Sequence, residues 1–411
     1  MRLRALEQPF IRATVTNFFF FLGLNGFVLL PLHIHRLGGT EVEIGIVMGL
    51  YSGVGIVCQP LLGPWVDVLG RRPFMLLGPV LVVVSALLAS VAGNIGLLAV
   101  VRVLQWLGFS AFFLGSFSYV IDLVPPARRG WALGIYGVAG LMATAIAPVL
   151  GEWIVRRLGF PALSLVSAAL TAAAGVLALN LRELRPVGVL PIRGGELFRG
   201  GLADMLHLHM AVTVFFGLGS GTTFAFLPTF ADALGVSTLS LFYTAYAGAA
   251  MGVRIFGGRL IDTLGRRAVI IPSMFVQAAA TALMASLGLF VSAASVVPVV
   301  PFLFLAGLLA GGAHGFLYPG LAALVVDRTP EARRATVVGI FSAMFLIGQT
   351  VGAFVFGYVA HAMGYGLMWT MLTFLLLIGS LLSAWLKPDR APEGARRAPD
   401  VRQAEPGQQG A

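Results

Sequence analysis

Twelve mostly apolar runs follow one another along the chain, separated by short polar segments. Each run has about 20 residues, the length that crosses the hydrocarbon core of a bilayer as a helix. The runs are continuously apolar rather than alternating, which disfavours a membrane barrel. With 58% hydrophobic and only 11% charged residues, the chain could not cover a water-facing surface in the usual way. The sequence therefore predicts an all-α membrane protein with twelve transmembrane helices. The expected spans are residues 13–32, 44–66, 74–91, 95–119, 132–154, 161–180, 210–230, 240–261, 268–290, 300–326, 337–359 and 364–386.

Two polar segments divide this pattern. Residues 181–209 separate the sixth span from the seventh, and residues 388–411 are rich in proline, glycine, glutamine and charge. We expect a six-helix bundle over residues 1–180, a linker over 181–209, a second six-helix bundle over 210–387 and a disordered tail over 388–411.

The basic residues indicate the orientation. Most of the 27 lysines and arginines fall on one side of the membrane if the N-terminus lies inside, as the positive-inside rule requires. We therefore expect both termini in the cytoplasm and the protein in the plasma (inner) membrane. The net charge of +10 reflects this asymmetry, so no nucleic-acid partner is expected. The single cysteine, Cys58, excludes a disulfide framework, and no metal site or cofactor is expected.

A short polar segment occurs twice. DVLGRRP begins at Asp67 and DTLGRRA begins at Asp262, each at the end of an apolar run and each preceded four residues earlier by a glycine, Gly63 or Gly258. A second repeat aligns DLVPPARRGWALG, from Asp122, with DRTPEARRATVVG, from Asp327. One half of the protein therefore repeats the other.

The segment GPWVDVLGRR resembles motif A of the major facilitator superfamily, and GGRLIDTLGRR resembles its second-half counterpart. The resemblance implies two pseudo-symmetric six-helix bundles that rock to expose a central site alternately to each side. It also implies a conformational gate of charges and turn glycines that holds the outward-facing state. We expect Arg72 and Arg267 only to anchor the topology. The gate residues are Gly63, Asp67, Gly70, Arg71 and Asp122 in the first half and Gly258, Asp262, Gly265, Arg266 and Asp327 in the second.

RVLQWLG, from Arg102 to Gly108, resembles motif B, with Trp106 where the family usually has glycine. A guanidinium within a span is costly, so Arg102 should face the interior or water, and Gln105 should share its face. In the fifth span, Gly134, Pro148 and Gly151 fall at the spacings of motif C, which is typical of twelve-helix antiporters. We expect them to allow close packing of the fifth and eighth spans. Ala143, Ala147 and Glu152 replace glycines of that motif.

None of the 17 acidic residues lies in the middle of an expected span, so the usual carrier of protons is missing from the core. His314 in the tenth span is the candidate for proton exchange, since the ordinary pKa of histidine is about 6.5. The alternative is a structural role or a contact to substrate. The resemblance implies that spans 1, 4, 7 and 10 line the cavity. The expected cavity residues are Asn25, Arg102, Gln105, Thr223, His314 and Tyr318.

These residues predict a secondary active transporter that exports small amphipathic or neutral organic molecules and resembles the drug and sugar efflux branch, with proton antiport left open. A cavity anion drawn to Arg102 is also compatible. The alternatives are a metabolite uptake permease and a non-transporting membrane sensor or scaffold. An enzyme is not expected, because paired core acids, H-E-x-x-H and G-x-x-x-x-G-K-[ST] are absent. The expected partners are a small-molecule substrate and the lipid bilayer, and the family default is a monomer.

Overall fold

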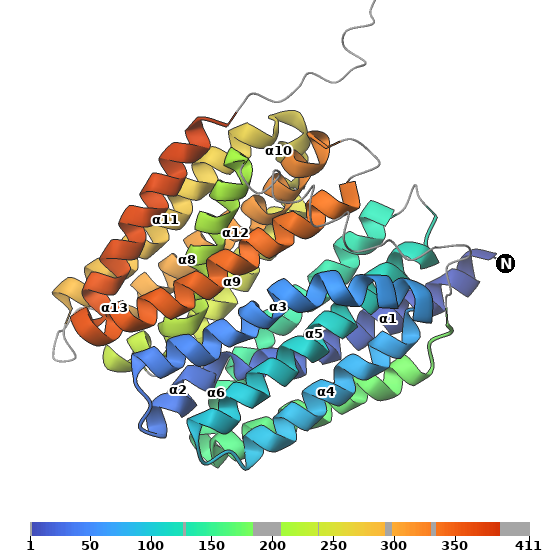
Figure 1. Ribbon diagram of the computed structural model, residues 1–411, viewed down its shortest axis with the longest axis horizontal. Coiled ribbons are helices and arrows are strands. Elements are labelled where there is room, and N and C mark those ends of the chain that lie inside the picture. Colours follow the sequence, from blue (N-terminus) through green and yellow to red (C-terminus); the bar gives the residue numbers. More distant parts are fainter. Residues whose placement is uncertain are drawn as a thin grey trace, which may run out of the picture.

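The computed structural model describes residues 2–125, 129–183, 207–236, 238–291, 298–329 and 334–386. All regular structure in these ranges is helical (Figure 1). The helices are α1 (Arg2–Asn25), η1 (Gly26–Leu29), α2 (Leu30–Arg36), α3 (Glu41–Leu69), α4 (Arg72–Ser90), α5 (Ile95–Leu123), α6 (Arg129–Leu179), α8 (Leu208–Ala233), α9 (Ser240–Gly252), the π-helical segment η3 (Val253–Gly257), α10 (Gly258–Thr263), α11 (Arg266–Phe290), α12 (Val299–Asp327) and α13 (Arg334–Ala384). The expected linker falls largely outside the described residues, and the expected tail lies wholly outside them.

Two of these helices cross the membrane twice. α6 and α13 have 51 residues each, so a straight helix would be about 75 Å long, more than twice the thickness of a hydrocarbon core. Each folds back at a glycine with positive φ, Gly159 at 83° and Gly364 at 78°, a conformation that other residues adopt only at a cost. With α1, η1 and α2 as one span and α9, η3 and α10 as another, the described residues make the twelve expected crossings.

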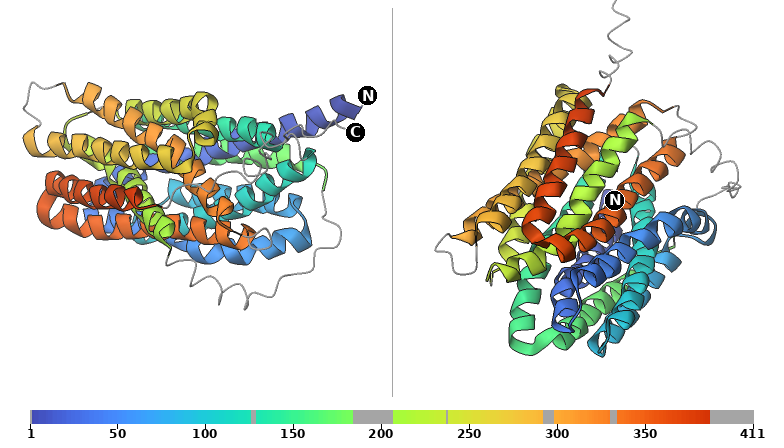
Figure 2. Two further views of the ribbon diagram at one scale, coloured as in Figure 1. Left: turned by 90° about the horizontal axis from the view of Figure 1, so that it is seen from above. Right: turned by 60° about the vertical axis from the view of Figure 1, so that its left-hand side comes forward.

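The helices gather in two groups, α1 to α6 and α8 to α13, which stay separate in the right-hand view of Figure 2. Within the groups, α1 packs on α6, α4 on α5, α8 on α13 and α11 on α12. The groups meet mainly where α3 lies along α13 and where α6 lies along α9. We call these groups the first and second bundles.

Local sequence explains where several helices begin. Thr40 and Glu43 form a capping box at the start of α3, in which each side chain binds the other's backbone N–H. Asn94 accepts a 2.9 Å hydrogen bond from the Leu97 N–H at the start of α5. Both contacts satisfy donors that the first turn of a helix leaves without partners. Large apolar side chains such as Phe256, Phe290 and Trp385 are exposed, as expected of a surface that lies in lipid.

Glycines bring α8 and α13 into close contact. A Cβ atom added at Gly217 would overlap the Phe345 carbonyl oxygen, and one added at Gly221 would overlap the backbone of Gln349. Small residues of this kind let helices approach closely in membranes, where packing rather than the hydrophobic effect drives their association.

Replacing Gly217 with valine should therefore destabilise the second bundle by about 1–3 kcal/mol, because the added side chain forces the two backbones apart. Thermal unfolding of the purified protein in detergent measures this loss. The matched control is Gly248→Ala on α9, where no described atom lies within 4 Å of the added carbon. Equal melting temperatures for Gly217→Val and the control would contradict the close packing of α8 on α13.

Candidate functional site

The two loops that carry the repeated seven-residue segments, DVLGRRP from Asp67 and DTLGRRA from Asp262, are called the heptamer loops, and they make the same contacts in their own bundles. The Arg71 Nε atom lies 3.1 Å from the Asp122 Oδ2 atom, and its Nη1 atom donates a 2.8 Å hydrogen bond to the Val66 carbonyl. In the second bundle, the Arg266 Nε atom lies 3.1 Å from the Asp327 Oδ2 atom, and its Nη1 atom donates a 2.8 Å hydrogen bond to the Ile261 carbonyl. The repeat in the sequence is thus a repeat in structure. We call the end of the molecule that holds these loops the heptamer end and the opposite end the far end.

The loop glycines have the conformation that the turn requires. Gly70 has φ of 101° and Gly265 has φ of 90°, and glycine adopts such values without strain. No described atom lies within 4 Å of a Cβ built on Gly63, so this glycine makes no close helix contact there. Gly258 begins α10. Asp67 lies in α3 and Asp262 in α10, but both side chains are outside the described part of the structure, and their roles stay predictions.

Arg72 and Arg267 do more than anchor the topology. The Arg72 Nη2 atom donates a 2.7 Å hydrogen bond to the carbonyl of Leu179, at the end of α6. The Arg267 Nη2 atom donates a 2.6 Å hydrogen bond to the carbonyl of Ala384, at the end of α13. Both satisfy carbonyls that a helix C-terminus leaves without partners. The sequence analysis missed this role, because it follows from the spatial contact of helix ends far apart in the chain.

The two arginine–aspartate pairs should differ in strength. The Arg71 side chain is 7% exposed and that of Asp122 is 36% exposed, against 21% and 54% for Arg266 and Asp327. Arg71→Gln should lower the free energy of unfolding by about 1.5–3 kcal/mol, which is typical of a buried hydrogen bond to a charged group. Arg266→Gln should lower the free energy of unfolding by at most about 1 kcal/mol, because water and salt screen the ion pair with Asp327. Melting temperatures at low and high salt test this order, and a larger loss for Arg266→Gln would refute it.

A cavity of about 150 Å³ lies between the bundles. Helices α1, α3, α5 and α6 and segment η1 of the first bundle contribute to its wall, as do α8, α9 and α13 of the second. Its lining residues are Leu24, Asn25, Phe27, Val28, Met48, Tyr51, Ser52, Arg102, Thr144, Pro148, Gly221, Phe224, Ala225, Tyr243, Gln349 and Ala353. A site shared by two bundles changes shape when the bundles move relative to each other.

Arg102 is the charged residue of this wall. It is only 4% exposed, and its Nη1 atom donates a 3.0 Å hydrogen bond to the Gln105 Oε1 atom. Its Nη2 atom lies 2.6 Å from the Met48 sulfur, and its guanidinium lies 4.7 Å from the centre of the Tyr51 ring. The Tyr51 ring in turn meets Trp106 edge-on, with 4.6 Å between ring centres. Trp106, which replaces the usual glycine of motif B, therefore positions the aromatic ring beneath the cation.

Three other expected residues lie at or near this cavity. Asn25 lines it and donates a 2.9 Å hydrogen bond from its Nδ2 atom to the Thr144 hydroxyl. Gln105 is fully buried beside Arg102. Thr223 is buried on α8 and does not line the cavity, although Gly221 and Phe224 do. Successive residues of a helix point in directions about 100° apart, which places Thr223 on another face.

His314 and Tyr318 lie elsewhere, in an aromatic cluster of the second bundle. The His314 ring is 5.2 Å from Phe216, 5.6 Å from Tyr246 and 6.1 Å from Tyr318, between ring centres. None of these residues lines the cavity around Arg102. The expectation that His314 and Tyr318 share a cavity with Arg102 is therefore corrected: they pack with α8, α9 and α13 within their own bundle.

Met48, Tyr51 and Ser52 on α3 were not among the expected cavity residues, because the resemblance implies that spans 1, 4, 7 and 10 line the cavity. Tyr51 and Ser52 are polar residues inside an apolar run, a signal that could have identified them.

The residues at motif C spacings have separate surroundings. Pro148 lines the cavity, and no described atom lies within 4 Å of a Cβ built on Gly134. A Cβ on Gly151 would lie 3.3 Å from Leu29 and 3.4 Å from Leu163. Gly151 thus packs within the first bundle rather than against α9.

Polar contacts join the bundles at the far end. The Glu41 Oε2 atom on α3 lies 3.1 Å from the His361 Nδ1 atom on α13. The Glu152 Oε2 atom on α6 accepts a 2.9 Å hydrogen bond from the Ser240 N–H, at the start of α9. Glu152, which departs from motif C, therefore satisfies a free donor at the positive end of a helix in the other bundle.

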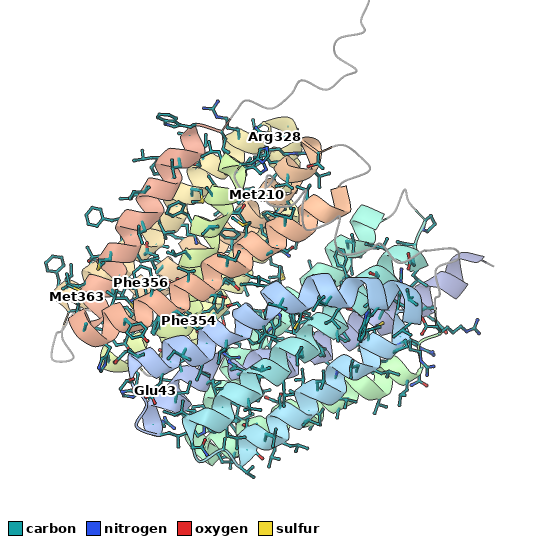
Figure 3. The ribbon with its side chains drawn as sticks, viewed as in Figure 1. Glu43, Met210, Arg328, Phe354, Phe356 and Met363 are labelled. Atoms are coloured by element: carbon teal, nitrogen blue, oxygen red, sulfur yellow. The ribbon has the colours of Figure 1, made fainter. Side chains whose placement is uncertain are left out.

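Phe354, labelled in Figure 3, adds an apolar contact between the bundles at this end. A Cβ added at Gly49 of α3 would overlap its ring. The glycine therefore gives α13 the space to lie directly along α3.

The model of the Major Facilitator Superfamily matches residues 13–297 and again residues 210–406. The chain belongs to the major facilitator superfamily. Its members are transporters, and the paired heptamer loops and the cavity between two bundles are what this fold provides.

Three similar proteins illustrate the relationship. The staphylopine export protein of Staphylococcus aureus is 24% identical over 406 residues, covering 94% of this chain and 98% of that one. The multi-drug resistance efflux pump PmrA of Streptococcus pneumoniae is 24% identical over 351 residues, covering 82% and 85%. The crystal structure of the nucleoside transporter NupG superposes with a TM-score of 0.70 at 16% identity, covering 92% of this chain and 98% of that one.

Proposed function

We propose that this superfamily transporter is a secondary active exporter of small organic molecules that works by alternating access. The observation that carries the proposal is the cavity between the two bundles, to which both bundles contribute and where Arg102 is buried. A cavity built in this way opens toward one end when the bundles separate there and toward the other end when they rock back.

The contacts between α3 and α13 support a state that is closed at the far end. They join Glu41, Gly45, Gly49 and Ser52 to the segment from Thr350 to His361. Toward the heptamer end, Val57, Leu61 and Trp65 of α3 are exposed, and the ribbons of α3 and α13 diverge (Figure 1). The ion pairs of the heptamer loops are formed within each bundle in this same state. Their arginines and aspartates thus act as braces of single bundles, and contacts of Asp67 and Asp262 between the bundles stay a prediction.

Export is the favoured direction because two relatives aligned over most of their length are an export protein and an efflux pump by name. With the heptamer end in the cytoplasm, the described state would load substrate from inside. We propose protons as the coupling ion, with His314 in the aromatic cluster of the second bundle as the titrating group, since the described spans hold no acid at mid-depth.

Cells that express the protein should accumulate less of at least one solute from a panel of labelled organic molecules. A protonophore should abolish this difference if protons drive export. Asp67→Asn should insert normally and lose most of the export, because the gate charge is removed while the cavity is intact. Uptake rather than loss of a solute would make the protein an importer, and the absence of any flux across a broad panel would favour a sensor.

The far-end contact of Glu152 should favour closure of that end. Glu152→Gln removes the negative charge at the N-terminus of α9, whose interaction with the helix end is worth about 0.3–1 kcal/mol. The ratio of the closed to the open state at the far end should therefore fall by about two- to fivefold. Spin labels on cysteines at Leu37 and Met363, in a Cys58→Ser background, report the distance between the bundles at this end. The distance distribution should move to longer values.

Glu43→Gln is the matched control for this experiment. Glu43 lies in the capping box of the first bundle and its recorded hydrogen bonds are with Thr40. A shift of the same size in both variants would show that Glu152 has no special role in closure.

A further inference from the structure

The cavity contains one formal charge and nothing to neutralise it. Of its described lining residues, Arg102 alone is charged, and the rest are apolar, aromatic or neutral polar. The recorded partners of the guanidinium are an amide oxygen, a thioether sulfur and an aromatic ring. A cation at this depth in a membrane normally pairs with an acid or lines a water-filled path. No ion pair of Arg102 is present among the described residues.

The Arg102 guanidinium has more donors than recorded acceptors. A guanidinium carries five N–H groups, and the Arg102 Nε atom has no partner among the described residues. Nearby, the Gln105 Nε2 atom and the Trp106 Nε1 atom are also buried without partners, and so is the Tyr243 hydroxyl in the cavity wall. Neither Gln105 nor Trp106 lines the cavity, so the free donors in its wall belong to Arg102 and Tyr243. A ligand that pairs with them must supply acceptor oxygens.

The rest of the wall sets the shape of this ligand. Phe27, Val28, Phe224 and Ala225 present apolar surface to the cavity. A cavity of about 150 Å³ accommodates a benzene-sized group. The site thus combines a cation with donors at one side and an apolar pocket of the size of one ring.

We propose that the cavity binds a small organic anion, whose carboxylate or similar oxyanion pairs with Arg102 while its apolar body lies against Phe224 and Phe27. This inference rests on the proposed function, since it names the class of substrate that the transporter carries. The negative charge that the spans lack arrives with the substrate. Tyr51 and Gln105 hold the guanidinium in place before the anion binds, which reduces the ordering that binding requires.

Binding of benzoate and benzamide to the full-length protein in detergent tests the inference, because the two probes share a shape and differ in charge. Wild type should bind benzoate at least about tenfold more tightly than benzamide, as expected for a charge-assisted pair. Arg102→Gln should remove this preference and keep benzamide binding. Arg102→Lys should keep the preference with weaker affinity, because lysine lacks the planar fork of donors. Melting temperature and gel filtration confirm that each variant is folded.

Arg254→Gln is the matched control. Arg254 is also an arginine within a span whose Nε atom has no described partner, but it does not line this cavity. Its substitution should leave the ratio of benzoate to benzamide affinity unchanged. A preference that survives Arg102→Gln, or that falls equally in Arg254→Gln, would overturn the inference.

Three further outcomes also decide against it. Equal affinities for benzoate and benzamide in the wild type would show that charge is not recognised. If none of benzoate, phenylphosphonate and benzenesulfonate binds in a way that depends on Arg102, the site does not take an organic anion. The same holds if chloride alone saturates the site.

The transport assay separates this inference from the proposed function. Export of neutral solutes without anion binding would contradict the proposal of an organic-anion substrate and support the proposal of an exporter. Anion binding at Arg102 without any flux would support the anion site and contradict the proposal of an exporter.

Discussion

The absence of water in the hydrocarbon core determines most of this structure. Each span must satisfy its own backbone hydrogen bonds as a helix, and the backbone groups that a helix leaves without partners lie at its ends. Several charged side chains are found there. Arg72, Arg267 and Glu152 satisfy free carbonyls or N–H groups at helix ends. Arg102 differs from these residues, because it is a buried cation in the wall of the cavity and serves no helix end.

The two bundles share their braces and differ in their chemistry. Arg71 and Arg266 make equivalent bonds in their own bundles. The position of α12 that corresponds to Arg102, counted back from Asp327 as Arg102 is from Asp122, is Gly307. A Cβ added at Gly307 would lie 2.5 Å from the Phe242 carbonyl oxygen, so α12 packs tightly on α9 where α5 carries a guanidinium. The two bundles therefore share the equivalent ion pairs, and the loss of symmetry at this position gives the first bundle a buried cation in the cavity wall.

Much of the fold follows from the sequence, because span length and the repeated loop are local signals. The turns at Gly70 and Gly265 and the pairing of Arg71 with Asp122 were predictable for this reason. The cavity was predicted less well. Arg102 and Asn25 line it, but His314 and Tyr318 do not, since which face of a helix meets the cavity depends on the rotation of each helix in its bundle. The contact from Glu152 to α9 joins separate bundles, and no periodicity in the sequence contains that information.

The two ends of the molecule use polar contacts in different ways, and this difference bears on how it could move. At the heptamer end the recorded ion pairs lie inside single bundles and hold each one rigid. At the far end Glu41 and Glu152 reach across to the other bundle, through one hydrogen bond each. Contacts of this kind near the surface are worth about 1 kcal/mol or less. They can favour one state without trapping it. Rocking, as proposed above, would exchange these bonds together with the packing of α3 on α13 and of α6 on α9, while the ion pairs within the bundles stay intact.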